Sequence, residues 1–123
     1  MKTNIVCLLL AILPATYLRL PAQGIKISSG ASLVMNGSAN LVLSNSGLTN
    51  NGQFSPGIGT VVFSGNSATS GSFINGSSST GFYNLTLNKS ANGIQLGRNI
   101  TLSNTFCIFW CSNVNFSIQI HFS

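Results

Sequence analysis

The chain has 123 residues and a formal net charge of +5, and it contains neither Asp nor Glu. Without carboxylates it lacks the acid–base pair of most glycosidases and the usual ligands of calcium, so we do not expect an enzyme or a cofactor. The length suits one domain at most.

The first 24 residues have the layout of a secretory signal peptide. Lys2 provides the positive charge, Ile5 to Leu13 form an apolar run, and Ala22-Gln23-Gly24 ends the segment with small residues. The apolar run is too short to cross a bilayer core, and no second run follows it. We therefore expect a secreted or cell-surface protein with no stable transmembrane span after signal removal; the alternative is an uncleaved N-terminal anchor.

The positive charge does not predict a nucleic-acid-binding protein. Two of the five cations lie in the signal, and the other three, Lys26, Lys89 and Arg98, are far apart in the sequence. Nucleic-acid surfaces need clustered Lys and Arg that release counterions together. Solubility must instead depend on the many hydroxyl and amide side chains.

Residues 25–104 form a polar region in which short apolar groups alternate with Asn, Ser, Thr and Gly. Leu85 and Leu87, like Ile100 and Leu102, stand two apart with a polar residue between them, which is the period of a strand with one buried face. On this basis we expect strands at Ser32 to Met35, Leu41 to Ser44, Thr60 to Ser64, Ser72 to Ile74, Phe82 to Asn88, Ile94 to Leu96 and Asn99 to Ser103.

The segments between these strands contain Asn-Gly, Ser-Gly and Pro-Gly, which favour turns because Asn and Gly tolerate positive φ. Short strands with frequent turns suit a β-solenoid or a β-sandwich. We favour an all-β fold built as a short β-solenoid of three or four coils, in which stacked Asn, Ser and Thr bond from coil to coil. The β-sandwich is the alternative.

Residues 105–123 differ from the rest, since they lack glycine and are rich in aromatic residues. Their last ten residues alternate strictly between apolar and polar side chains, which predicts an amphipathic strand. This segment is either a cap strand that closes the stack or a tail read in a shifted frame at the end of a truncated gene.

Cys107 and Cys111 are candidates for a disulfide bond. Residues four apart on an extended strand lie about 13 Å from each other, whereas a disulfide needs Cα atoms within about 7 Å, so the bridge requires a turn between them. Together with His121 these thiols remain one ligand short of a closed zinc site, so we expect no metal. The alternative is two buried thiols.

Several motifs follow one another in a fixed order: GLTNNGQF at 47–54, GIGTVVFSGN at 57–66 and FYNLTLN at 82–88. Residues 47–104 thereby resemble the large secreted β-strand-repeat, adhesin-like surface proteins of Gram-negative bacteria. The resemblance implies export to the cell surface and a role in adhesion or the cell coat. The partners we expect are either surface glycans or neighbouring repeats of the same kind. It carries over no catalytic residue.

Three functions are therefore considered. The first is a non-catalytic structural or adhesive β-repeat fragment at the bacterial surface. The second is a carbohydrate-binding module in which Phe82, Tyr83 or Trp110 stacks on surface glycans. The third is a truncated reading frame without function.

Overall fold

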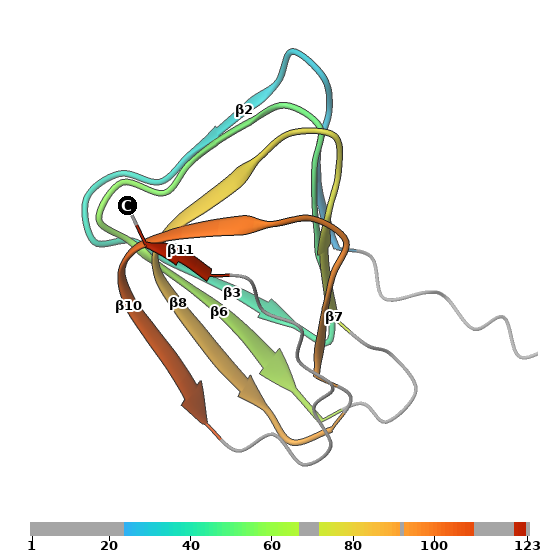
Figure 1. Ribbon diagram of the computed structural model, residues 1–123, viewed down its shortest axis with the longest axis vertical. Coiled ribbons are helices and arrows are strands. Elements are labelled where there is room, and N and C mark those ends of the chain that lie inside the picture. Colours follow the sequence, from blue (N-terminus) through green and yellow to red (C-terminus); the bar gives the residue numbers. More distant parts are fainter. Residues whose placement is uncertain (1–23, 67–71, 92, 110–119, 123) are drawn as a thin grey trace, which may run out of the picture.

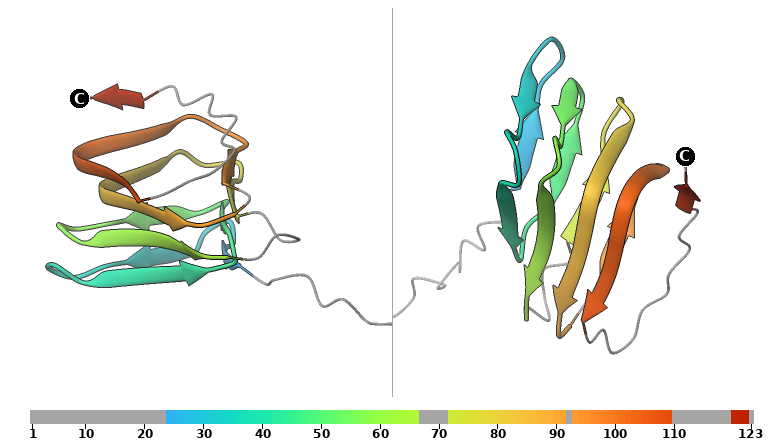
Figure 2. Two further views of the ribbon diagram at one scale, coloured as in Figure 1. Left: turned by 90° about the horizontal axis from the view of Figure 1, so that it is seen from below. Right: turned by 90° about the vertical axis from the view of Figure 1, so that its left-hand side faces the viewer.

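The computed structural model describes residues 24–66, 72–91, 93–109 and 120–122, and for 120–122 it describes the backbone alone. All regular structure in these residues is β-strand, and no helix occurs among them. The chain winds as a three-sided coil (Figure 1). Successive coils stack on one another (Figure 2).

The first two coils have one strand on each side. The first consists of β1 (Ile25–Ile27), β2 (Ser32–Val34) and β3 (Asn40–Ser44), and the second of β4 (Leu48–Asn50), β5 (Gln53–Ser55) and β6 (Thr60–Gly65). Each strand pairs in parallel with the equivalent strand of the next coil, for example Leu43 with Phe63.

The next two coils use one long strand for two sides. The third consists of β7 (Ser72–Asn75) and β8 (Thr80–Lys89), and the fourth of β9 (Ile94–Leu96) and β10 (Ile100–Phe109). β8 and β10 bend in the middle, so that each runs along two sides of the coil (Figure 1). The short strand β11 (Ile120–Phe122) pairs in parallel with Ile100 to Leu102 at the start of β10, so it lies over the second side of the fourth coil.

The strands form three parallel sheets, with orders β1-β4-β7-β9, β2-β5 and β11-β10-β8-β6-β3. Every described pairing is parallel and joins one coil to the next. A sandwich of this size would be built from antiparallel hairpins or Greek keys. The predicted β-solenoid is therefore confirmed, and the sandwich alternative is wrong.

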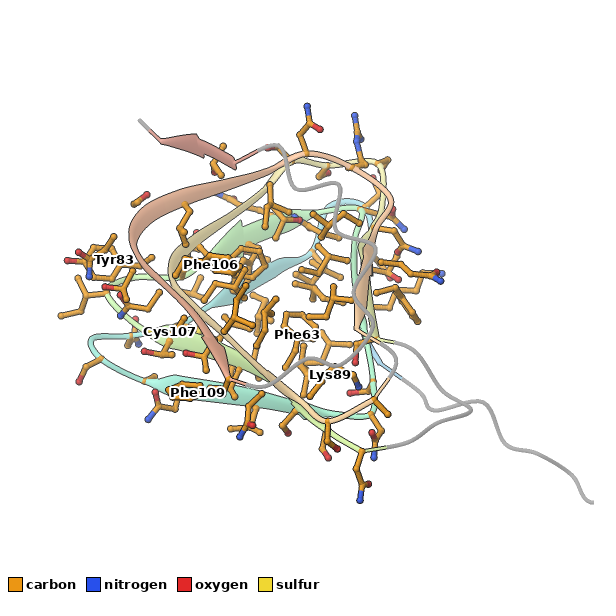
Figure 3. All side chains as sticks on the ribbon, turned by 60° about the horizontal axis from the view of Figure 1, so that its bottom comes forward. Phe63, Tyr83, Lys89, Phe106, Cys107 and Phe109 are labelled. Carbon is orange, nitrogen blue, oxygen red and sulfur yellow. The ribbon has the colours of Figure 1, made fainter. Side chains whose placement is uncertain are left out.

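The interior of the coil is filled by columns of apolar side chains. One column stacks Leu43, Phe63 and Leu87, and its neighbour stacks Val61 on Leu85. Figure 3 shows the side chain of Phe63 inside the coil. Since each coil covers the apolar face of the one before it, burial is most complete in the middle coils, where Val61 and Phe63 are fully enclosed.

The turn residues do what their chemistry predicts. Asn45 is the described non-glycine residue with positive φ, at 49°, and Gly65 lies one coil later with φ 109°. Gly37, Gly57 and Gly76, from the predicted Asn-Gly and Pro-Gly turns, also have positive φ. The turn signals in the sequence are thus confirmed at these corners.

The expected strands are all present, Ile94 to Leu96 with the expected ends and the others with shifted ends, and the described residues contain three more. The expected strand at Asn99 to Ser103 continues to Phe109 as β10, so it crosses the boundary between residues 104 and 105 without a break. The strands that the pattern did not predict are β1, β4 and β5, each three residues long. Of the strand predicted over the last ten residues, only β11 lies within the described residues.

A glycine on the first sheet is covered by an aromatic ring. A Cβ built on Gly47 would lie 2.6 Å from ring carbons of Phe73, which occupies the same position one coil later. The ring therefore lies on the bare backbone of Gly47, an arrangement known to stabilise glycines in sheets.

We expect Gly47→Ala to lower the free energy of unfolding by about 1–3 kcal/mol, because the new methyl group displaces this ring. Thermal and urea unfolding of Gly47→Ala, Phe73→Ala and the double variant measures the coupling between the two positions. If the ring is displaced, the double variant costs less than the sum of the single ones. Strict additivity contradicts this packing.

Candidate functional site

The candidate stacking residues lie in different environments. The side chain of Phe82 is 0% exposed, and its ring packs against that of Phe54 with centroids 5.8 Å apart and planes tilted by 59°. Phe82 is thus a core residue that presents no face to a ligand. Tyr83 is half-buried and projects outward (Figure 3). Trp110 lies outside the described residues.

Tyr83 is positioned by the bend of β8. Phe82 and Leu85 are both buried although they are three residues apart, so the alternation of the strand is broken between them. Both Tyr83 and Asn84 therefore lie on the outer side of the corner. β10 makes the same corner with a bulge, since the pairing shifts between Leu102 and Thr105.

A ladder of polar side chains runs along the coils next to Tyr83. Asn104 donates through Nδ2 to Oδ1 of Asn84 at 2.8 Å, and Asn84 donates through its own Nδ2 to Oγ1 of Thr60 at 3.3 Å. On the first sheet Oγ1 of Thr49 donates to Oδ1 of Asn75 at 2.8 Å. These bonds join residues 20, 24 and 26 apart, so the predicted amide and hydroxyl ladders exist and tolerate coils of unequal length.

Tyr83 and this ladder form the surface among the described residues that best fits a sugar. An aromatic face beside fixed amide groups can combine stacking with hydrogen bonds to hydroxyl groups. The amides of Asn84 and Asn104 already bond each other, which holds them in place. We call Tyr83, Asn84 and Asn104 the corner surface.

The candidate disulfide is described at one end only. Cys107 has a free thiol, half-buried, on the outer side of β10 in the column that also contains Val62 and Thr86. Cys111 lies outside the described residues, as does the side chain of His121. No group of three or more metal-binding side chains occurs in the part of the chain that the structure describes.

The three cations among the described residues do not share a surface. Lys26 is exposed on β1, Arg98 is exposed at a corner and donates to the carbonyl oxygens of Gly76 and Ser77, and Lys89 is 1% exposed at the end of β8. They therefore form no patch of the kind that binds a phosphate backbone. Among the described residues no helix is long and apolar enough to span a membrane.

The sequence did not predict the polar residues that are buried. Asn50 is 0% exposed and donates through Nδ2 to the carbonyl oxygen of Ser79 at 2.9 Å and to Oγ1 of Thr80 at 3.2 Å. Its Oδ1 accepts from the backbone N–H of Gly52 at 3.2 Å. The side chain of Asn50 thus links its own turn to the corner of the next coil. The Asn-Asn-Gly motif predicted the turn but not this link.

Ser72 is a second buried polar residue, and its Oγ has no hydrogen-bond partner among the described residues. Because a buried hydroxyl without a partner costs about 1–3 kcal/mol, we expect Ser72→Ala to raise the free energy of unfolding by about 1 kcal/mol. Chemical denaturation measures this, with Ser44→Ala, an exposed serine on β3, as the control that should change stability little. A loss of stability in Ser72→Ala would show that the hydroxyl is bonded.

Comparisons with known proteins give no relative for this chain. No protein-family model, no curated protein and no solved structure matches it.

Proposed function

We propose that this protein is an exported, non-catalytic β-solenoid repeat with a structural or adhesive role at the bacterial cell surface. The observation that carries the proposal is the pairing of an apolar interior with an outer surface bonded by amides and hydroxyls, in a chain without Asp or Glu. Such a surface neither needs counterions nor offers an acid–base pair.

Cell fractionation tests the export. The full chain with a C-terminal epitope is produced in a Gram-negative host, and intact cells are treated with a protease that does not enter them. We expect the epitope in the medium or on the surface, where the protease removes it. A matched variant with Leu8→Arg and Leu9→Arg, which disrupts the apolar run of the signal, should stay inside the cell. Protein retained in the cytoplasm without these changes contradicts the proposal.

The corner surface supports carbohydrate binding as a second candidate, because Tyr83 projects outward beside two amides held by each other. The purified protein is applied to a glycan array together with Tyr83→Ala and Thr86→Ala. The matched control Thr86 is also half-buried on the outer side of β8 but outside the corner. Binding that is lost in Tyr83→Ala and kept in Thr86→Ala supports this candidate, whereas no binding to any glycan leaves the structural role.

A further inference from the structure

Among the described residues, the first coil leaves one end of the stack open. β1, β2 and β3 are each the last strand of their sheet, so each has an edge without a partner among the described residues (Figure 2). Val34 on β2 and Val42 on β3 are both 58% exposed. Open strand edges are sites where another chain can add, and soluble proteins usually guard them with charges, bulges or proline.

The strands at this end have few of the residues that prevent another strand from adding to an open edge. β3 reads Asn-Leu-Val-Leu-Ser, with no charge, no proline and no glycine, and β2 reads Ser-Leu-Val. The one charge on the strands of this coil is Lys26, on β1. Since the chain has no carboxylate, a cationic edge cannot be matched by an acidic one from a second copy.

The hydrogen bonds show which groups of β3 point to the open edge. The carbonyl oxygen of Ala39 accepts from Thr60, and the N–H of Asn45 donates to Ser64, so the odd-numbered residues of β3 bond to β6. In a parallel strand the alternate residues point the other way. The N–H and C=O groups of Asn40, Val42 and Ser44 therefore face the open edge.

The sequence of β3 is nearly symmetric about Val42. If a second β3 lies antiparallel on this edge with Val42 opposite Val42, then Asn40 meets Ser44 and Leu41 meets Leu43. The residues that face the edge then exchange hydrogen bonds pairwise, and the inward leucines continue the apolar interior. The ladder of the stack thus continues into the second copy with polar beside polar and apolar beside apolar.

We propose that two copies of this chain dimerise through their first coils, with β3 antiparallel to the partner's β3 about a two-fold axis at Val42. An axis normal to this sheet brings β1 of one copy onto β2 of the other, so the two Lys26 side chains do not meet. Among the described residues the opposite end of the stack is uneven, because β11 covers the first part of β10 and not Thr105 to Phe109. A head-to-tail filament would need that end to be flat. The proposal does not depend on the proposed function.

Sedimentation velocity over a concentration series tests the dimer, with the protein as recovered from the producing cells and its N-terminus defined by mass spectrometry. We expect a monomer–dimer equilibrium. Val42→Lys places two like charges opposite each other at the axis and should raise the dimer dissociation constant at least about tenfold. The control Val62→Lys changes the same outer column one coil further in and should leave the constant unchanged. Circular dichroism shows whether each variant keeps its β-structure.

Val42→Cys provides a test that does not depend on the folding of a charged variant. Opposed Cα atoms in an antiparallel hydrogen-bonded pair lie about 5.5 Å apart, within the range of a disulfide. With the native cysteines replaced by serine, mild oxidation should therefore yield a covalent dimer from Val42→Cys, and not from Val62→Cys or from the chain without an introduced cysteine. A monomer at every concentration, with no covalent dimer, contradicts the proposal, as does growth beyond the dimer.

Discussion

Replacing Asn50 by aspartate is expected to lower the free energy of unfolding by about 3 kcal/mol at neutral pH. The side-chain Nδ2 of Asn50 donates to the carbonyl oxygen of Ser79 and to Oγ1 of Thr80, and the residue is fully buried. An aspartate puts a charged oxygen next to that carbonyl oxygen and loses the donor. Equilibrium urea denaturation measures the change.

The pH dependence of this variant identifies the cause. Burial and the facing carbonyl oxygen disfavour the charged form, so the pKa of the introduced carboxyl is raised above its ordinary value of about 3.9. A group with a raised folded-state pKa contributes its full stability below the unfolded pKa and loses it as pH rises. The penalty should therefore shrink as pH falls toward 4, because the protonated acid is again a donor. The unsubstituted chain has no carboxyl side chain to confuse this comparison.

The neighbouring Asn51 provides the matched control. Its Oδ1 accepts from the backbone N–H of Ser77 at 2.9 Å and from the Ser77 hydroxyl at 3.2 Å, and it is half-buried. A carboxylate keeps these acceptor roles, so Asn51→Asp should change stability by no more than about 0.5 kcal/mol. Equal losses in the two variants would contradict the assignment of Asn50 as a buried donor.

Phe82→Ala is expected to have the second large effect, a loss of about 3–5 kcal/mol. The ring is enclosed in the core and contacts Phe54, so its removal leaves a cavity and breaks an aromatic pair. Tyr83→Ala, one residue further on and half-buried, should cost about 1 kcal/mol or less. Thermal unfolding followed by circular dichroism separates the two, and similar losses in both would show that the corner is packed differently.

The fold was predictable from the sequence where strands are regular. Leu41 and Leu43, or Leu85 and Leu87, give the inward columns directly, and the Asn-Gly and Pro-Gly pairs give the corners. The pattern did not predict β4, because Asn50 is polar although it lies at a buried position. A buried amide can be recognised only from the groups that bond to it, and Ser79 and Thr80 are a full coil away.

The candidate stacking site was predicted only in part, for a different physical reason. Extending the two-residue period back from Leu85 puts Phe82 on the outer side, whereas the bend between them puts it inside. The bend is recognised from the pairing of β8 with its neighbours, in which Asn84 begins the side that faces β6, and the residues Phe-Tyr-Asn carry no turn signal of their own. Tyr83 is half-buried and can still contact a ligand. Its position beside the hydrogen bond between Asn84 and Asn104 could not be predicted from the sequence, because these two residues are 20 positions apart.

The short sequence separation between paired strands determines what it costs such a chain to grow. Among the described residues, each strand pairs with the equivalent strand one turn away along the sequence, 20 to 26 residues on. The entropy lost on closing a loop depends on the length of that loop. Duplicating a turn therefore adds the same small loss of loop-closure entropy whatever the length of the existing stack. The new turn also buries the apolar side chains at the end of the old one.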